Sequence, residues 1–140
     1  MASATRLYTP DILALAVELA RFPLDPAMPL QGSGRSPSCG SSLTLSLACD
    51  GAARITALGA RAQACAIGQA STALFLAAAP GRSAAEIAAT RDQLRAWLAN
   101  GAAMPDWPGL DRLLAAREFP ARHGAIMLPW NAALDALSPG

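Results

Sequence analysis

Two cysteines carry the chemistry that this sequence offers. Cys39 lies in the stretch Ser-Pro-Ser-Cys-Gly-Ser (36–41), and Cys65 lies in Ala-Cys-Ala-Ile-Gly-Gln-Ala-Ser (64–71). Each thiol stands beside glycine or other small residues at the expected edge of an element, where it is reachable and a ligand has room. A β-hairpin is expected between them and would return the second thiol towards the first. This arrangement is typical of a metal-binding or sulfur-handling site. Because the chain has no Cys-x-x-Cys pair, two cysteines without a common function are the alternative.

The composition predicts one cytoplasmic domain that spans residues 1–140. The chain is 53% hydrophobic and 15% charged. No apolar run reaches the ~20 residues that a membrane-spanning helix needs, and the N-terminus lacks the layout of a signal peptide. We therefore expect a soluble protein with no membrane partner. The cysteine count is odd, and a reducing compartment disfavours disulfides, so the thiols should be free or bound to metal.

Charge and motif content exclude several functions. All 11 basic residues are arginine, and they are scattered along the chain without forming a stripe. The sequence therefore lacks the clustered basic residues that nucleic-acid binding requires. The sequence also shows no Ser–His–acid set for nucleophilic catalysis and no glycine-rich loop for phosphate binding. It shows no pair of carboxylates near residues that indicate a cleft. We expect a protein that binds, assembles or passes on a metal or sulfur cargo, and not an enzyme with turnover.

The first half of the chain predicts a helix followed by strands. Thr9-Pro10-Asp11 combines an N-cap, a proline at the first helical position and an acid, and the helix it starts should end at Pro23. Residues 23–38 are rich in proline, glycine and serine, which indicates a loop or a short edge strand. Alternating leucines predict a strand over 43–49, and Asp50-Gly51 predicts a hairpin turn into a return strand over about 54–61. Either of the two alternating residue sets in that return strand could face inward.

The second half predicts helices. One should run from Cys65 to Ala79 and a second from the capping box that starts at Ser83 to Asn100-Gly101. A short helix is expected over 110–116, and a last one from Ala125 or Pro129 to Leu137. The fold class is therefore α+β, with a small antiparallel sheet packed against helices.

The local settings of the three cysteines differ. Cys65 stands where a helix begins, and the helix dipole and unpaired N–H groups there favour a thiolate. Cys39 lies in a proline-rich loop and should be accessible. Cys49 alternates with three leucines, so we interpret it as a small buried hydrophobe and leave it out of the site.

Three ordered motifs resemble those of the iron–sulfur cluster scaffold family of the IscU/SufU/NifU N-terminal type. The motifs are residues 36–41, residues 64–71, and Phe-Pro-Ala-Arg (119–122) followed by Leu-Pro-Trp-Asn-Ala-Ala-Leu (128–134). In that family they resemble Asn/Ser-Pro-x-Cys-Gly-Asp, Gly-Cys-Ala-Ile-Ser-x-Ala-Ser and Arg-x-Lys-Cys-Ala-x-Leu-Pro-Trp. The similarity extends from about residue 7 to 137. It implies an IscU/SufE-like sandwich of sheet and helices.

The resemblance also implies a ligand set. Family members hold zinc or an assembling [2Fe–2S] cluster with three cysteines and an aspartate. Cys39 and Cys65 match the first two cysteines, Ser41 stands at the aspartate, and Ala125 stands at the third cysteine. Two of four expected ligands are thus replaced. His123, two positions before Ala125, is a candidate substitute ligand, and a local hydrogen bonder is the alternative. Ser41 is a poor ligand for soft metals, and capping of the local turn is its alternative role.

Three functions follow from the resemblance. The first is a scaffold that holds iron, a [2Fe–2S] cluster or zinc through Cys39 and Cys65, with His123 and Ser41 as weaker candidates and a homodimer as a way to share ligands. The second is a sulfur acceptor that takes persulfide sulfur from a cysteine desulfurase. The third is an interaction module that has lost the chemistry. The implied partners are a cysteine desulfurase and apo iron–sulfur client proteins, and we place the scaffold function first.

Overall fold

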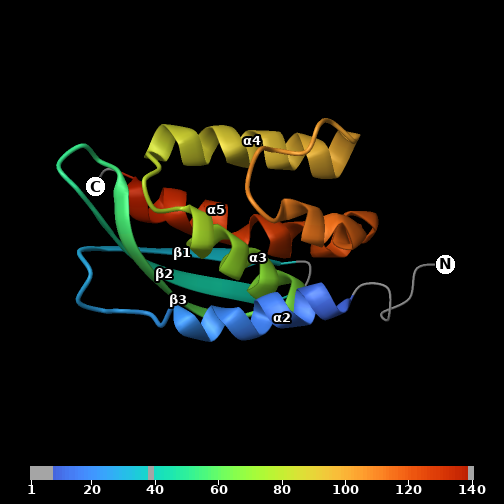
Figure 1. The fold of residues 1–140 in the computed structure, drawn as a ribbon, viewed down its shortest axis with the longest axis horizontal. Helices are drawn as coiled ribbons and strands as arrows, with labels where there is room; N and C mark the ends of the chain where they lie inside the picture. The colour runs from blue at the N-terminus through green and yellow to red at the C-terminus, as the bar shows by residue number, and fades with distance from the viewer. Residues whose placement is uncertain (1–7, 38–39, 139–140) are drawn as a thin grey trace.

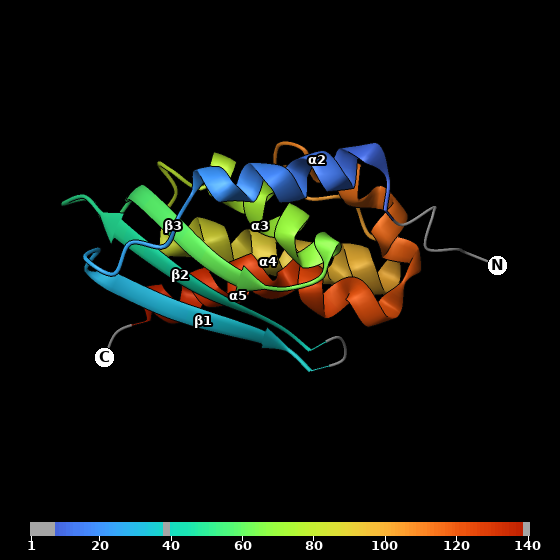
Figure 2. The same ribbon diagram turned by 90° about the horizontal axis from the view of Figure 1, so that it is seen from below.

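A three-stranded antiparallel sheet forms one layer of the molecule, and helices cover one of its faces (Figures 1 and 2). The computed structural model describes residues 8–37 and 40–138. The strands are β1 (Leu30–Ser36), β2 (Ser41–Cys49) and β3 (Ile55–Gln63), in the order β1-β2-β3. The expected α+β class is therefore confirmed, and the segment 23–38 contains the edge strand β1.

The pairing of β2 with β3 decides which residues of the return strand face the core. Leu45 lies opposite Ala60, and Leu47 lies opposite Leu58. Residues that pair directly share a face of the sheet, so Leu58 and Ala60 point inward with the leucines. A register shift near Cys49 turns Ile55 inward as well, where it is 1% exposed.

The main helices are α2 (Pro10–Glu18), α3 (Ala66–Ala78), α4 (Ala84–Asn100) and α5 (His123–Leu137). The described residues also form 3₁₀ helices at Leu19–Arg21, Leu110–Glu118 and Pro120–Arg122. The hydroxyl of Thr9 accepts a hydrogen bond from Ile12 N at 3.2 Å, and Ser83 forms the expected capping box with Glu86. Both local signals are confirmed. No helix in the described part of the chain is long and apolar enough to cross a membrane.

The expected start of the last helix was wrong by a few residues. α5 begins at His123 and continues through Pro129, which lies inside the helix. Proline lacks an N–H group and usually marks a helix boundary. Here Pro129 is buried in the core region, so tertiary packing maintains the helix on both sides of it.

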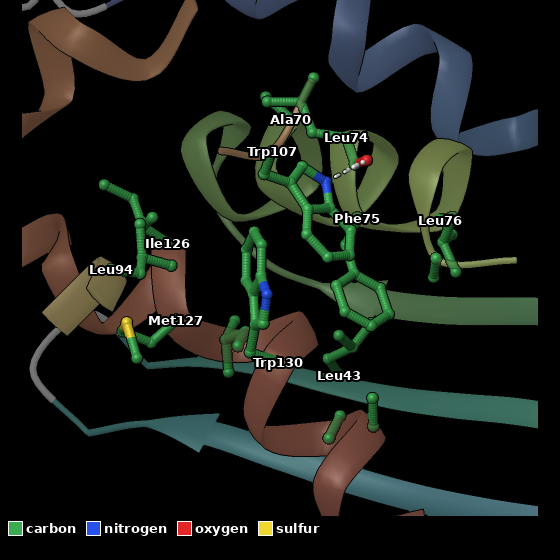
Figure 3. Packing of buried hydrophobic residues seen from close by; sticks show 14 of the residues in the cluster. Leu43, Ala70, Leu74, Phe75, Leu76, Leu94, Trp107, Ile126, Met127 and Trp130 are labelled. Carbon is green, nitrogen blue, oxygen red and sulfur yellow. Dashed lines mark hydrogen bonds between the residues drawn. The ribbon is translucent and has the colours of Figure 1, made fainter. Parts of the chain in front are cut away.

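Three aromatic rings fill the core between the helices (Figure 3). Phe75 stacks on Trp107 with 5.3 Å between ring centroids, and Trp130 meets both rings edge-on at 5.2 Å. The indole N–H of Trp107 donates to the carbonyl of Leu74 at 3.1 Å. The guanidinium of Arg82 lies 4.0 Å from the ring centroid of Trp107, as in a cation–π contact. The cluster joins α3, α5 and the segment between α4 and the 3₁₀ helix.

Two glycines of β1 let α5 lie directly on the strand. A Cβ atom added to Gly32 would collide with the carbonyl oxygen of Ala132 and the backbone nitrogen of Ala136. A Cβ atom on Gly34 would lie 3.1 Å from the carbonyl oxygen of Leu128. Only glycine permits so close an approach. The contact fixes the position of α5, and with it the helix start at His123 that borders the candidate site.

Candidate functional site

The site lies where the ends of β1 and β2 meet the first turns of α3 and α5. Ser36, the last residue of β1, pairs with Ser41, the first of β2, and both are buried. The backbone N–H of Cys65 donates a 3.4 Å hydrogen bond to the hydroxyl of Ser41. The hairpin end that carries the first motif therefore contacts the cysteine of the second motif.

Cys65 is held by its backbone while its thiol stays free. It is the N-cap residue of α3, half-buried, and its side chain makes no capping hydrogen bond. On one side its N–H group binds Ser41, and on the other the side chain of Gln69 donates to the carbonyl of Ala64 at 2.8 Å. The chain around the thiol is thus fixed from both directions, which positions the sulfur without engaging it.

Ser41, which the resemblance places at the family aspartate, makes a structural contact. Its side chain is 3% exposed, and its oxygen accepts the hydrogen bond from Cys65. This bond joins residues 24 positions apart, so it differs from the capping of the local turn that was the alternative role for Ser41. A neutral hydroxyl that already accepts a hydrogen bond is a weak ligand for iron or zinc.

Ala125, at the place of the third cysteine, faces the first turn of α3. It is fully buried, and a Cβ atom added to Gly68 would lie 3.6 Å from the Cβ of Ala125. The residue that the resemblance places at the third cysteine therefore lies next to the first turn of α3. The residue there offers only a methyl group, so this position contributes packing and no ligand.

His123 makes a local hydrogen bond at the start of α5. Its Nε2 atom lies 2.7 Å from the carbonyl oxygen of Arg117, which requires Nε2 to carry the proton in that contact. The Nδ1 atom then remains an acceptor. The neighbouring Gly124 packs so closely on Ser36 that an added Cβ atom would collide with its hydroxyl.

The described residues do not complete a metal site. Within 8–37 and 40–138, no group of three histidine, cysteine, aspartate or glutamate side chains lies close enough together to hold a metal ion. Cys39 lies outside the described residues. The flanking strand ends are described: Ser41 accepts a hydrogen bond from Cys65, and Ser36 pairs with Ser41.

Cys49 lies at the opposite end of β2 from Ser41. It is half-buried and packs against the hydrophobic core. Burial, together with the negative charge of Asp50, raises the pKa of the Cys49 thiol above its ordinary value of 9.0. A protonated thiol is a poor nucleophile and a poor metal ligand. Cys49 therefore lies where a packing residue would, as its alternation with the leucines indicates.

Two structural contributors to the site were missed by sequence reasoning. The hydroxyl of Ser71 donates to the carbonyl of Ile126 at 2.6 Å and ties α3 to α5 behind the site. Gln69 fixes the residue before Cys65, as described above. Both residues belong to the second motif, so their presence there was the available signal.

Comparisons with known proteins identify solved structures of the same fold. The sequence matches no protein-family model and no curated protein. Among solved structures, the chain is similar to the N-terminal part of a nitrogen-fixing NifU-like protein from Brucella abortus. That match has a TM-score of 0.85 and 25% identity over 96% of this chain and 94% of the other.

A second solved structure has the same fold. It is a protein from Fervidobacterium islandicum AW-1 assigned as the iron–sulfur cluster assembly scaffold of the SUF system. Its TM-score is 0.85 and its identity 20%, over 97% of this chain and all of the other. The chain therefore shares its fold with NifU-like N-terminal and SufU-type iron–sulfur scaffold proteins, which supports the resemblance that its three ordered motifs indicate.

Proposed function

We propose that this protein works in iron–sulfur cluster assembly as a scaffold, with iron or a [2Fe–2S] cluster as its cargo. The observation that carries the proposal is the hydrogen bond from the backbone N–H of Cys65 to Ser41, which joins the hairpin end of the first motif to the cysteine of the second. In this proposal the cargo is held by the thiolates of Cys39 and Cys65. Thiolates are the usual protein ligands of such clusters, and zinc is an alternative occupant.

The remaining ligands must come from elsewhere or from weak donors. A [2Fe–2S] cluster takes four protein ligands. Ser41 already accepts a hydrogen bond, and Ala125 has no donor atom. His123 binds the carbonyl of Arg117 through Nε2, so Nδ1 is the ring atom that would serve as its donor to the cargo. An incomplete ligand set favours a labile cargo, and a second copy of the chain or a client apo-protein would supply the missing ligands.

A second candidate function is that of a sulfur acceptor. The loss of ligands at Ser41 and Ala125 favours it, because sulfur transfer requires a single accessible thiolate. The thiolate of Cys65 would attack the terminal sulfur of a persulfide on a cysteine desulfurase. The sulfur–sulfur bond of the desulfurase persulfide breaks, a new one forms at Cys65, and the desulfurase cysteine leaves as a thiolate. The reaction needs no further oxidant or reductant.

Anaerobic reconstitution separates the two functions. The protein would be incubated with a cysteine desulfurase and cysteine, first without iron and then with ferrous iron and a thiol reductant. A scaffold develops the visible absorbance of a protein-bound cluster only when iron is present. An acceptor gains the mass of one sulfur atom on Cys65 without iron and develops no cluster. If neither product forms and the desulfurase still binds, both chemical functions are wrong and an interaction module remains.

A further inference from the structure

The free edge of the sheet carries a contact between β1 and α5. The strand order leaves β1 with a neighbour on one side only, and Figure 2 shows it as the outermost strand. The backbone N–H of Ser33, in the middle of β1, donates a 3.0 Å hydrogen bond to Oδ2 of Asp135. The carboxylate of Asp135, 102 positions away in sequence, therefore accepts the hydrogen bond of the central N–H group on this edge.

The alternation of an antiparallel pair identifies the rest of this edge. In such a pair, alternate residues turn both N–H and C=O towards the neighbouring strand, and the residues between them turn both groups away. Because the N–H of Ser33 binds Asp135, the outward set is Gln31, Ser33 and Arg35. All three residues are exposed. The same alternation turns the backbone N–H groups of Gln31 and Arg35 away from β2 and towards the free edge. The edge thus resembles a template for another strand.

We propose that Asp135 prevents a second copy of the chain from adding its β1 strand to this edge. Ser33 is the central residue of the seven-residue strand Leu30–Ser36. Antiparallel pairing about a two-fold axis at Ser33 therefore aligns two copies of β1 over their full length. The same axis places Gln31 opposite Arg35 of the second copy, so no like charges lie opposite each other within the strands. The product is a continuous six-stranded sheet.

Within residues 8–37 and 40–138, the carboxylate of Asp135 is the feature that opposes this pairing. It lies where the carbonyl oxygen of Ser33 from the second copy would accept its hydrogen bond. The two-fold axis would also bring two Asp135 carboxylates together, and like charges at that separation repel. Gly32 and Gly34 fix α5 on β1, so the carboxylate is held in place. Charged side chains are a common protection of sheet edges.

The test compares the monomer–dimer equilibrium of variants by analytical ultracentrifugation. Asp135→Ala removes both the acceptor and the charge, and its dimer dissociation constant should be at least about tenfold lower than that of the parent. Asp135→Asn keeps an acceptor without the charge and should lie between the two. Asp111→Ala removes an exposed acid away from β1 as a matched control and should leave the equilibrium unchanged.

Amide hydrogen exchange locates the interface. In the Asp135→Ala dimer, the amides of Gln31 and Arg35 should become protected as concentration rises. Adding Ser33→Pro should abolish the dimer, because it removes the outward N–H without removing a hydrogen bond to β2. The proposal is overturned if the folded Asp135→Ala protein remains as monomeric as the parent. It is equally overturned if a dimer forms without protection of these amides, or if the parent already pairs through this edge.

Discussion

The hydroxyl of Ser41 accepts a hydrogen bond from the backbone N–H of Cys65 across 24 positions of sequence. This contact ties the end of the β1–β2 hairpin to the start of α3. The resemblance to the scaffold family places Ser41 where that family has a ligand aspartate. Here the residue holds the backbone of the neighbouring cysteine.

Loss of this hydroxyl should loosen the start of α3. Ser41→Ala leaves the N–H of Cys65 without its acceptor in a partly buried place, which should lower the free energy of unfolding by about 1–2 kcal/mol. Urea denaturation followed by tryptophan fluorescence measures the change. Ser42→Ala, on the outer face of the same strand, is the control and should stay within about 0.5 kcal/mol of the parent. Equal effects of the two substitutions would show that the contact does not stabilise the fold.

Restoring the third cysteine should strengthen cargo binding. Ala125→Cys places a thiol against the first turn of α3, near Gly68, and adds a thiolate to the ligand set. We expect more iron or zinc per chain after anaerobic purification, measured by elemental analysis. Ala133→Cys puts a thiol at another fully buried alanine of α5 and should bind no additional metal. An identical metal content in the two variants would contradict the position assigned to the site.

The packing of α5 on β1 should depend on Gly32. Gly32→Ala adds a methyl group that meets two backbone atoms of α5, so the helix or the strand must shift. We expect the free energy of unfolding to fall by about 1–3 kcal/mol or more. Gly51→Ala is the matched control, because an added Cβ there meets nothing within 4 Å. A Gly32→Ala protein as stable as the control would refute this close approach. Urea denaturation of both variants decides the matter.

Cys49 should contribute a pH-dependent part of stability. Its pKa is raised in the folded protein, first by burial and then by Asp50. Between the unfolded pKa and the higher folded pKa, the native state binds more protons than the unfolded state. This contribution is therefore fully present below the unfolded pKa near 9.0 and is lost as pH rises through the folded pKa. Cys49→Ala should remove that decline when unfolding is measured from pH 7 upward. An unchanged decline in the variant would assign it to other groups.

Local signals in the sequence were sufficient for most of the fold. The Thr9 cap, the Asp50-Gly51 turn and the Ser83 capping box each act within a few residues, and each appears in the structure. The carboxylate of Asp50, for example, accepts hydrogen bonds from Ala52 N at 2.9 Å and Arg54 N at 3.1 Å. Such signals depend on neighbouring residues only, so the sequence displays them directly.

Features that depend on distant contacts were not predicted. β1 has few apolar residues, and its glycines serve the approach of α5, which no local pattern announces. The contacts of Ser41 with Cys65 and of Ser33 with Asp135 join residues far apart in sequence. The ligand positions came from the family resemblance. The geometry adds that Ala125 adjoins the first turn of α3, while His123 is engaged with Arg117.

The most direct test of the proposed function is the metal and acid-labile sulfide content of the anaerobically purified protein. The parent would be compared with the Cys39→Ala/Cys65→Ala double variant and with Cys49→Ala. The scaffold function predicts iron and sulfide, or zinc, in the parent and in Cys49→Ala, and their loss from the double variant. Metal that persists in the double variant, or that disappears only with Cys49→Ala, would contradict the assignment of the site to Cys39 and Cys65.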